Sequence, residues 1–181
     1  TSVAAYHNYN YLIMMQNLTD HLNEEEKKYK IRQRLWKVRA KKVILATGSI
    51  ERTMVFDCND RPGIMLSSAV RKYLNHYSVK CGNNVVIFSN NDDAYETALS
   101  LHNKGVIIKA IIDIRENSQG DLVKKCVDVG LKILWKHTVV STGGKKKINQ
   151  VSVMKLSNDN NSVIENTITI NCDLLCVSGG Y

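Results

Sequence analysis

The stretch VVIFSNNDDAYETALSLHNKGVIIKAIID, residues 85–113, decides the fold. Two apolar runs, Val85–Phe88 and Val106–Ile112, have the length of buried strands. Between them, a segment from about Asp93 to Asn103 repeats apolar residues at helical spacing, and Gly105 is a typical stop. A strand, a helix and a second strand in this order predict a βαβ unit with parallel strands and a right-handed crossover.

Downstream of this unit, the pattern predicts one more helix and then an antiparallel region. The helix covers Leu122–Val129, and a short strand, Leu131–Trp135, follows it. Three further strands are expected at Thr138–Ser141, Gln150–Leu156 and Val163–Ile170. Asp173–Val177 is then an apolar run of the kind found in a strand that is covered on both faces.

Upstream, the sequence predicts an antiparallel meander and a second buried strand. The meander strands are expected at Ser2–Tyr6, Tyr11–Leu18 and Ile31–Arg39. Lys42–Gly48 contains a continuous apolar run and predicts another strand covered on both faces. After an irregular link, Ser67 and Ser68 are predicted to cap a helix whose apolar residues recur on one face.

Two of the predicted buried strands end in small residues, Thr47-Gly48 and Ser178-Gly179-Gly180. In open α/β sheets, ligands lie beyond the carboxyl ends of the strands, where glycine lets a backbone approach a phosphate or a ribose. Thr47, Gly48, Gly179 and Gly180 are therefore the candidate cofactor-binding residues, as one wall of a nucleotide pocket. The alternative is that these residues only form turns.

The likeness of the two strand ends predicts that both strands belong to one sheet. Residues 1–56 would then be part of one domain, and residues 57–170 would be a second domain inserted into it; the family resemblance described below implies that the first binds a nucleotide and that the second is Rossmann-like. Residues 171–181 would be the strand that returns to the first domain. The glycine loop of that domain would lie before Thr1, so the chain is expected to be a fragment that catalyses nothing alone. The alternative is two unrelated strands with glycine turns.

The turn between the strand and the helix of the βαβ unit departs from a dinucleotide-binding turn. Such a turn is expected to contain GxGxxG, because glycine permits the tight bend and the approach of pyrophosphate to the helix N-terminus. Residues 89–94 instead contain no glycine and place Asp92 and Asp93 where a phosphate would lie. Asp113 stands where a ribose-binding acid belongs, but without the glycine loop we expect NAD binding to be weak or absent.

Composition and spacing exclude several other classes of protein. The net charge of +8 is spread along the chain, with one run, Lys145–Lys147, in a predicted turn, so nucleic-acid binding is not expected. No apolar run is long enough to cross a bilayer. The five cysteines form no CxxC pair and the histidines have no metal-ligand spacing, so we expect no metal site and a cytoplasmic location. No residue is predicted to be catalytic.

Several motifs carry a resemblance to a known family. Lys42–Gly48 resembles the ATG segment of glutathione reductase-like flavoproteins, and Asp173–Gly180 resembles their return strand. More specifically, four motifs resemble the α subunit of heterotetrameric sarcosine oxidase: ATGSIER (46–52), NDRPGIM (59–65), AVRKYL (69–74) and FSNNDDAY (88–95). The resemblance runs over nearly the whole chain.

The resemblance implies an α/β fold class: a Rossmann-like FAD/NAD(P)-binding domain in three ββα layers, with an antiparallel meander, from a two-dinucleotide-domain protein. It implies the NAD-binding region of a subunit in a complex that oxidatively demethylates sarcosine to glycine and forms peroxide. FAD and FMN would be bound in the full complex and not by this chain, and the chief partner would be the β subunit. The alternatives are a related amine or opine dehydrogenase subunit, and a structural scaffold that binds no nucleotide.

Overall fold

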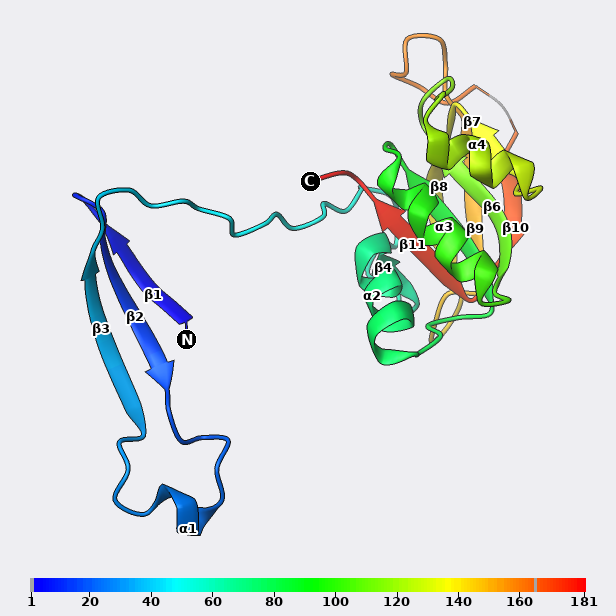
Figure 1. Ribbon diagram of the computed structural model, residues 1–181. Helices are drawn as coiled ribbons and strands as arrows, with labels where there is room; N and C mark the ends of the chain where they lie inside the picture. Colours follow the sequence, from blue (N-terminus) through cyan, green and yellow to red (C-terminus); the bar gives the residue numbers. More distant parts are fainter. Residues whose placement is uncertain (1, 165) are drawn as a thin grey trace. The chain divides into compact units, whose positions relative to one another are not determined.

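The computed structural model describes residues 2–164 and 166–181, which form two compact units divided after Gly48 (Figure 1). In the first unit, β1 (Ser2–His7), β2 (Tyr11–Asn17) and β3 (Gln33–Arg39) pair in sequence order as an antiparallel sheet, which confirms the predicted meander. A one-turn helix, α1 (Glu24–Lys27), lies between β2 and β3. Leu35 and Trp36 follow each other in β3 and so project to opposite faces, yet both are exposed.

The second unit is built around a five-stranded parallel sheet. Its strands lie in the order β4 (Ile64–Leu66), β11 (Leu174–Ser178), β5 (Asn84–Ser89), β6 (Ile107–Asp113) and β7 (Ile133–Trp135). Each neighbouring pair in that order is parallel. Strand β5, helix α3 (Asp93–Asn103) and strand β6 form the predicted βαβ unit.

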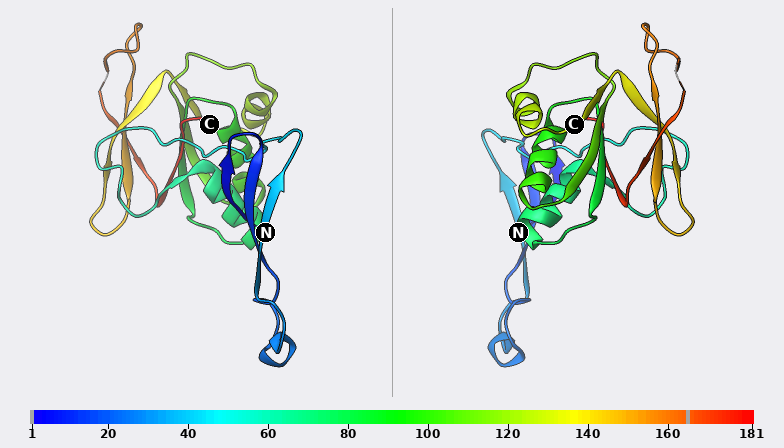
Figure 2. Two further views of the ribbon diagram at one scale, coloured as in Figure 1. Left: turned by 90° about the vertical axis from the view of Figure 1, so that its left-hand side faces the viewer. Right: turned by 90° about the vertical axis from the view of Figure 1, so that its right-hand side faces the viewer.

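Two different layers cover this sheet (Figure 2). One face carries the helices α2 (Ser67–Tyr77), α3 and α4 (Asp121–Asp128); the other carries the antiparallel strands β8 (His137–Gly143), β9 (Gln150–Lys155) and β10 (Ile168–Asn171). Because side chains alternate along a strand, β5 sends Val85 and Ile87 to the helices and Val86 and Phe88 to the antiparallel sheet. These layers confirm the predicted ββα class.

A carboxylate that is distant in sequence caps helix α2, instead of the serines predicted for this role. Ser67 and Ser68 lie inside the helix, and the N-cap residue, Leu66, has no side chain that could accept a hydrogen bond. The amide of Ser68 donates to Glu51 Oε2 at 2.7 Å. Glu51 is buried, and negative charge at this end of a helix is favourable because the first amide groups are unpaired.

The structure differs from the sequence analysis in several strands: β4 lies in the predicted irregular link, and β10 is shorter than the strand predicted at Val163–Ile170. The largest differences concern the two predicted buried strands that end in small residues. Residues 42–48 form no strand, and Ile44 and Leu45 are 91% and 67% exposed, because no described strand pairs with them. Strand β11 does not pair with that segment either; it lies between β4 and β5, inside the parallel sheet of the second unit. The apolar run 173–177 correctly predicted a strand covered on both faces, but not which sheet would cover it.

The two apolar runs should differ sharply in their contribution to stability. Ile87→Ala should lower the free energy of unfolding by ~2–5 kcal/mol, because Ile87 is fully buried in the parallel sheet. Ile44→Ala, the matched control in the exposed run, should change it by less than ~0.5 kcal/mol. Urea denaturation followed by circular dichroism measures both; equal effects would contradict the exposure of residues 42–48.

Candidate functional site

The carboxyl ends of β11, β5 and β6 meet at one edge of the parallel sheet. This edge is where ligands bind in open α/β folds. It carries Ser178, Ser89 and Asp113, which are aligned as partners across the three strands and are all fully buried. The loops that follow these strands supply the other residues of the candidate site.

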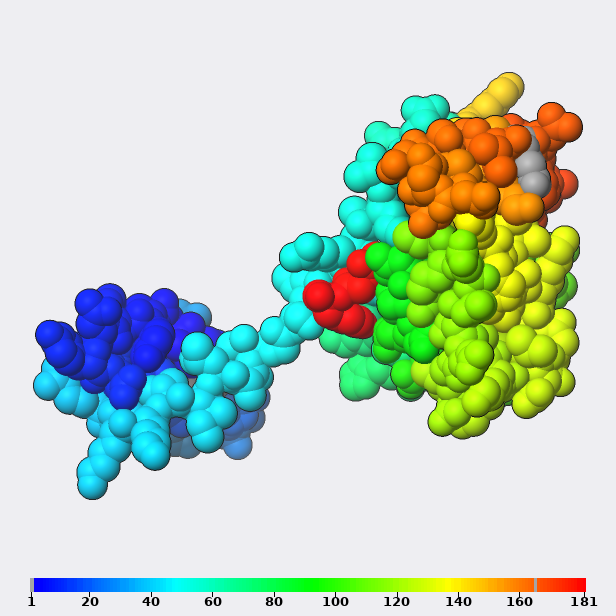
Figure 3. Space-filling model, turned by 90° about the horizontal axis from the view of Figure 1, so that it is seen from above, coloured from blue at the N-terminus to red at the C-terminus, as the bar shows by residue number. Residues whose placement is uncertain are grey.

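Gly179 and Gly180 permit a close backbone approach, but the approaching group is the chain itself. The amide of Arg52 donates to the Gly180 carbonyl at 2.7 Å, and the amide of Gly179 donates to the Arg52 carbonyl at 2.8 Å. A Cβ added at Gly179 would lie 2.8 Å from that carbonyl oxygen. In Figure 3, the C-terminal residues, in red, lie at the surface of this unit beside the segment that contains Arg52, in cyan.

Thr47 and Gly48 lie at the end of the first unit, whereas Gly179 and Gly180 belong to the second. Thr47 and Gly48 are exposed, and a Cβ added at Gly48 would have no other atom within 4 Å. The joint role of these four residues as one wall of a nucleotide pocket stays a prediction.

The turn after β5 is filled by its own side chains, and Asn91 is its centre. Its side-chain oxygen accepts a hydrogen bond from the amide of Asp93, in the first turn of α3, at 3.0 Å. Its side-chain nitrogen donates to Ser178 Oγ at 3.0 Å and so ties the turn to the end of β11. Asn91 therefore uses a helix amide that would face the pyrophosphate in a glycine-rich turn.

Both aspartates of the turn form ion pairs with arginines from other elements. Asp92 lies 2.8 Å from Arg115, and Asp93 accepts two hydrogen bonds from Arg71, at 3.0 and 3.1 Å. Arg71 also pairs with Glu96 at 2.7 Å. The carboxylates outnumber the guanidinium groups, so this arrangement does not attract another anion. The residues present do not fit a pyrophosphate bound in the manner of a GxGxxG turn.

Asp113, the candidate ribose-binding acid, is already engaged inside the protein. It is fully buried, accepts a hydrogen bond from Tyr95 Oη at 2.7 Å and pairs with Arg115 at 2.7 Å. Burial first, and then the bond to Asp113, raise the pKa of Tyr95, so the phenol stays a neutral donor. The hydrogen bond to Asp113 raises the pKa of Arg115, which keeps the guanidinium charged. Asp113 thus holds the edge together instead of facing a ligand.

The sequence analysis did not find Tyr95, Asn91, Arg71 or Arg115 as members of this edge. The only local signal was the spacing of Asp113 and Arg115, two residues apart at the end of a predicted strand. The partners of the two turn aspartates lie 22 or more residues away, and no periodicity could indicate them.

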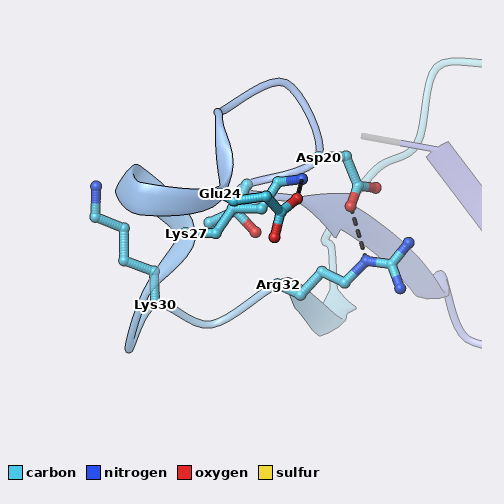
Figure 4. Close-up of a pocket in the computed structure, with 6 residues that line it drawn as sticks. Asp20, Glu24, Lys27, Lys30 and Arg32 are labelled. Carbon is cyan, nitrogen blue, oxygen red and sulfur yellow. Dashed lines mark hydrogen bonds and ion pairs between the residues drawn. The ribbon is translucent and has the colours of Figure 1, made fainter.

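A cavity of about 450 Å³ in the first unit is lined by a cluster of ion-paired surface side chains (Figure 4). It lies beside α1, where Lys27 pairs with Glu24 and Arg32 pairs with Asp20, each at 2.8 Å. Exposed pairs of this kind contribute little to stability, and these two cations are already neutralised by acids of the same loop. We do not assign a binding function to this cavity.

Within the described ranges, 2–164 and 166–181, no group of histidines, cysteines and acids could hold a metal ion. In the same ranges, no helix is long and apolar enough to cross a bilayer. Cys126, Cys172 and Cys176 are buried, as small hydrophobic residues often are. Burial raises the pKa of the Cys126 thiol to about 11 and that of Cys172 to about 12, so neither is poised to act as a nucleophile.

The parallel sheet, with helices on one face and an antiparallel sheet on the other, defines the fold class of this chain: the FAD/NAD(P)-binding oxidoreductase fold. Thioredoxin reductase of T. acidophilum matches with a TM-score of 0.61 and 17% identity, over 80% of this chain and 45% of that one. L-proline dehydrogenase from P. horikoshii matches with a TM-score of 0.56 and 19% identity, over 99% of this chain and 26% of that one. At these identities the likeness establishes the fold alone.

In sequence, the chain is a homologue of one region of sarcosine oxidase subunit alpha. The protein of that name from Corynebacterium sp. (strain P-1) is 35% identical over 183 residues, 100% of this chain and 18% of the relative. The one from Rhizobium meliloti (strain 1021) is 37% identical over 149 residues, 82% of this chain and 14% of the relative. The chain thus spans less than a fifth of the length of these relatives. No family model matches it.

Removal of the Tyr95 hydroxyl should test whether the edge is held by the Asp113 network. Tyr95→Phe should lower the free energy of unfolding by ~1–3 kcal/mol, because a buried carboxylate loses a donor that nothing replaces. Tyr73→Phe, at a tyrosine that is 45% exposed, is the matched control and should be within ~0.5 kcal/mol of the parent. Chemical denaturation of both variants measures the two free energies of unfolding. Equal values would show that the hydrogen bond from Tyr95 to Asp113 does not hold the sheet edge together.

Proposed function

We propose that this chain is the counterpart of the NAD-binding region in the α subunit of a sarcosine oxidase complex and is not catalytic by itself. The complex would oxidatively demethylate sarcosine to glycine and form peroxide. Two findings support this proposal: the homology to sarcosine oxidase subunit alpha over the whole chain, and a parallel sheet of the dinucleotide-binding type in which the described residues form no metal-ligating group.

Within this function, the chain would position and assemble other parts of the complex more than it would hold a nucleotide. The observation that carries this view is the turn at residues 89–94, where Asp92 and Asp93 are held by Arg115 and Arg71. NAD would therefore bind weakly or not at all to this chain. FAD and FMN would be bound elsewhere in the complex, and the β subunit would be the chief partner.

Two other functions remain as alternatives. A related amine or opine dehydrogenase subunit would share this fold and would differ in the substrate that its complex oxidises. A scaffold that binds no nucleotide would use the same sheet edge only for packing, which the self-contained network around Asp113 favours.

Calorimetric titration with NAD tests the electrostatic part of the proposal. The chain should show no saturable binding below millimolar concentrations. Asp92→Asn should strengthen binding about threefold to tenfold, because one negative charge beside the phosphates contributes roughly 1 kcal/mol of repulsion in a water-like dielectric. Glu116→Gln, which removes one charge from an exposed residue paired with Lys136, is the control and should have no effect. Tight binding by the parent chain would show that the acid-filled turn is a working site.

The catalytic part of the proposal requires the assembled complex. The chain alone should consume no oxygen with sarcosine, whereas a complex that contains it together with its partner subunits should consume oxygen and release peroxide. Reduction of an artificial electron acceptor by the complex, with sarcosine, proline and opines supplied one at a time, separates the alternatives, because a dehydrogenase need not pass its electrons to oxygen. Turnover of proline or an opine in preference to sarcosine would favour the dehydrogenase reading.

A further inference from the structure

The exposed side of helix α2 carries aromatic side chains, whereas a helix at a protein surface usually presents charged and polar ones to solvent. The helix lies at one end of the helical layer (Figure 1) and buries Val70 and Leu74 in the core. Tyr73 and Tyr77 are 45% and 57% exposed, and Val79, just after the helix, is 47% exposed. We call these three exposed residues the α2 patch.

The rings of the α2 patch are packed against one another. The centroids of Tyr73 and Tyr77 lie 5.8 Å apart, and the ring of His76 meets that of Tyr77 edge-on at 4.6 Å. The amide of Val79 donates to the carbonyl of Tyr73 at 3.0 Å, which holds Val79 beside the end of the helix. Side chains that already restrict one another lose less entropy when a partner binds. Tyrosine is also among the residues that contribute most to the affinity of protein interfaces.

A cavity of about 240 Å³ adjoins the α2 patch and is lined by Leu74, Asn75, Ser78, Lys80 and Lys104. The first three of these residues alternate along the chain with those of the patch, so the cavity and the patch form one surface. Lys80 follows α2 and Lys104 is the C-cap residue of α3, so two separate elements bring their cations to one cavity.

This surface lies away from the candidate site. The chain leaves α2 and enters β5 at Asn84, and it leaves α3 and enters β6 at Ile107. The cavity, lined from both of these connections, is therefore beside the amino ends of the two strands, whereas the candidate site is at their carboxyl ends.

The charge of this surface is positive. No acid lines the cavity, and within residues 2–164 and 166–181 no ion pair joins an acid to Lys72, Lys80 or Lys104. A second copy of the chain on the same surface would bring like charges together, which opposes association. A partner that carries acids complements the lysines instead.

We propose that the α2 patch and the adjoining cavity bind an acidic segment of a partner protein. Apolar side chains of that segment pack on Tyr73 and Tyr77, and one of its carboxylates enters the cavity between Lys80 and Lys104. This inference rests on the proposed function, which supplies the partners as the other subunits of the complex, and it names the surface on which one of them docks.

The aromatic part of the surface is tested by the affinity of the full chain for the other subunits of the complex, purified without it and immobilised for surface plasmon resonance. Tyr77→Ala should weaken association about tenfold or more, because truncation of an aromatic anchor removes packing at the centre of an interface. Tyr77→Phe, the matched control, keeps the ring and should change the affinity less than about threefold. Parent-like affinity of Tyr77→Ala would overturn the proposal.

The charged part is tested by a pair of double substitutions that change the net charge equally. Lys80→Glu with Lys104→Glu should weaken association about a hundredfold, because it sets like charges against the partner's acids. Lys145→Glu with Lys146→Glu, in the turn between β8 and β9 on the other face of the parallel sheet, should have much less effect. Equal effects of the two double variants would overturn the proposal. Thermal unfolding of each variant at the parent temperature shows that folding is not the cause.

Carbodiimide cross-linking of the associated proteins identifies the contact, because the reagent joins a lysine to a carboxylate only where the two meet. Mass spectrometry should find Lys80 or Lys104 joined to an acid of another subunit, and cross-links from other lysines alone would overturn the proposal. A dimer of the chain by itself that Tyr77→Ala abolishes would also overturn it, since a second copy would then occupy the surface.

The same measurements separate this inference from the proposed function. Association of the parent chain that neither Tyr77→Ala nor the Lys80 and Lys104 double variant weakens would retain the proposed function and overturn the docking surface. Failure of the parent chain to associate with the other subunits at all would overturn both.

Discussion

The second unit depends on the burial of β11 between β4 and β5. All five residues of β11 are buried; Leu174 and Cys176 face the helices, and Leu175 and Val177 face the antiparallel sheet. A strand from the end of the chain is thereby placed beside two strands that begin more than 80 residues earlier. This pairing brings Ser178 to the turn after β5 and Gly179 to the backbone of Arg52, so it builds the candidate edge.

The chemistry of that edge follows from its side chains more than from its fold. A parallel sheet whose helix begins at the end of a strand offers unpaired amides that suit a phosphate. Here Asn91 accepts one of these amide hydrogens, and three acids in and near the turn are paired with only two arginines. The fold of a nucleotide-binding oxidoreductase is retained, while the turn that would hold the nucleotide is closed by the residues of the chain.

In the first unit, too, the strands form where the sequence pattern predicts them, whereas the burial of their side chains depends on what packs against the sheet. Its strands pair as an antiparallel meander because their hydrogen bonds join neighbouring segments of the chain and need no other element. Its side chains have no second layer within the unit, so Leu35 and Trp36 stay exposed. Burial of apolar surface, which supplies most of the stability of a domain, therefore lies in the second unit.

The sequence by itself determined the elements whose signals are local. The βαβ unit at residues 85–113 and the meander follow from apolar periodicity and glycine stops, and the missing glycines at residues 89–94 were plain in the sequence. The ββα class followed from the resemblance of sequence motifs to a known family. Only the tertiary structure decided which strands pair and which charges meet. Two similar apolar runs, 42–48 and 173–177, became an exposed segment and a central strand, because burial depends on neighbours that are distant in sequence. For the same reason, Arg71 and Arg115 could be assigned to Asp93 and Asp92 only once the chain was folded.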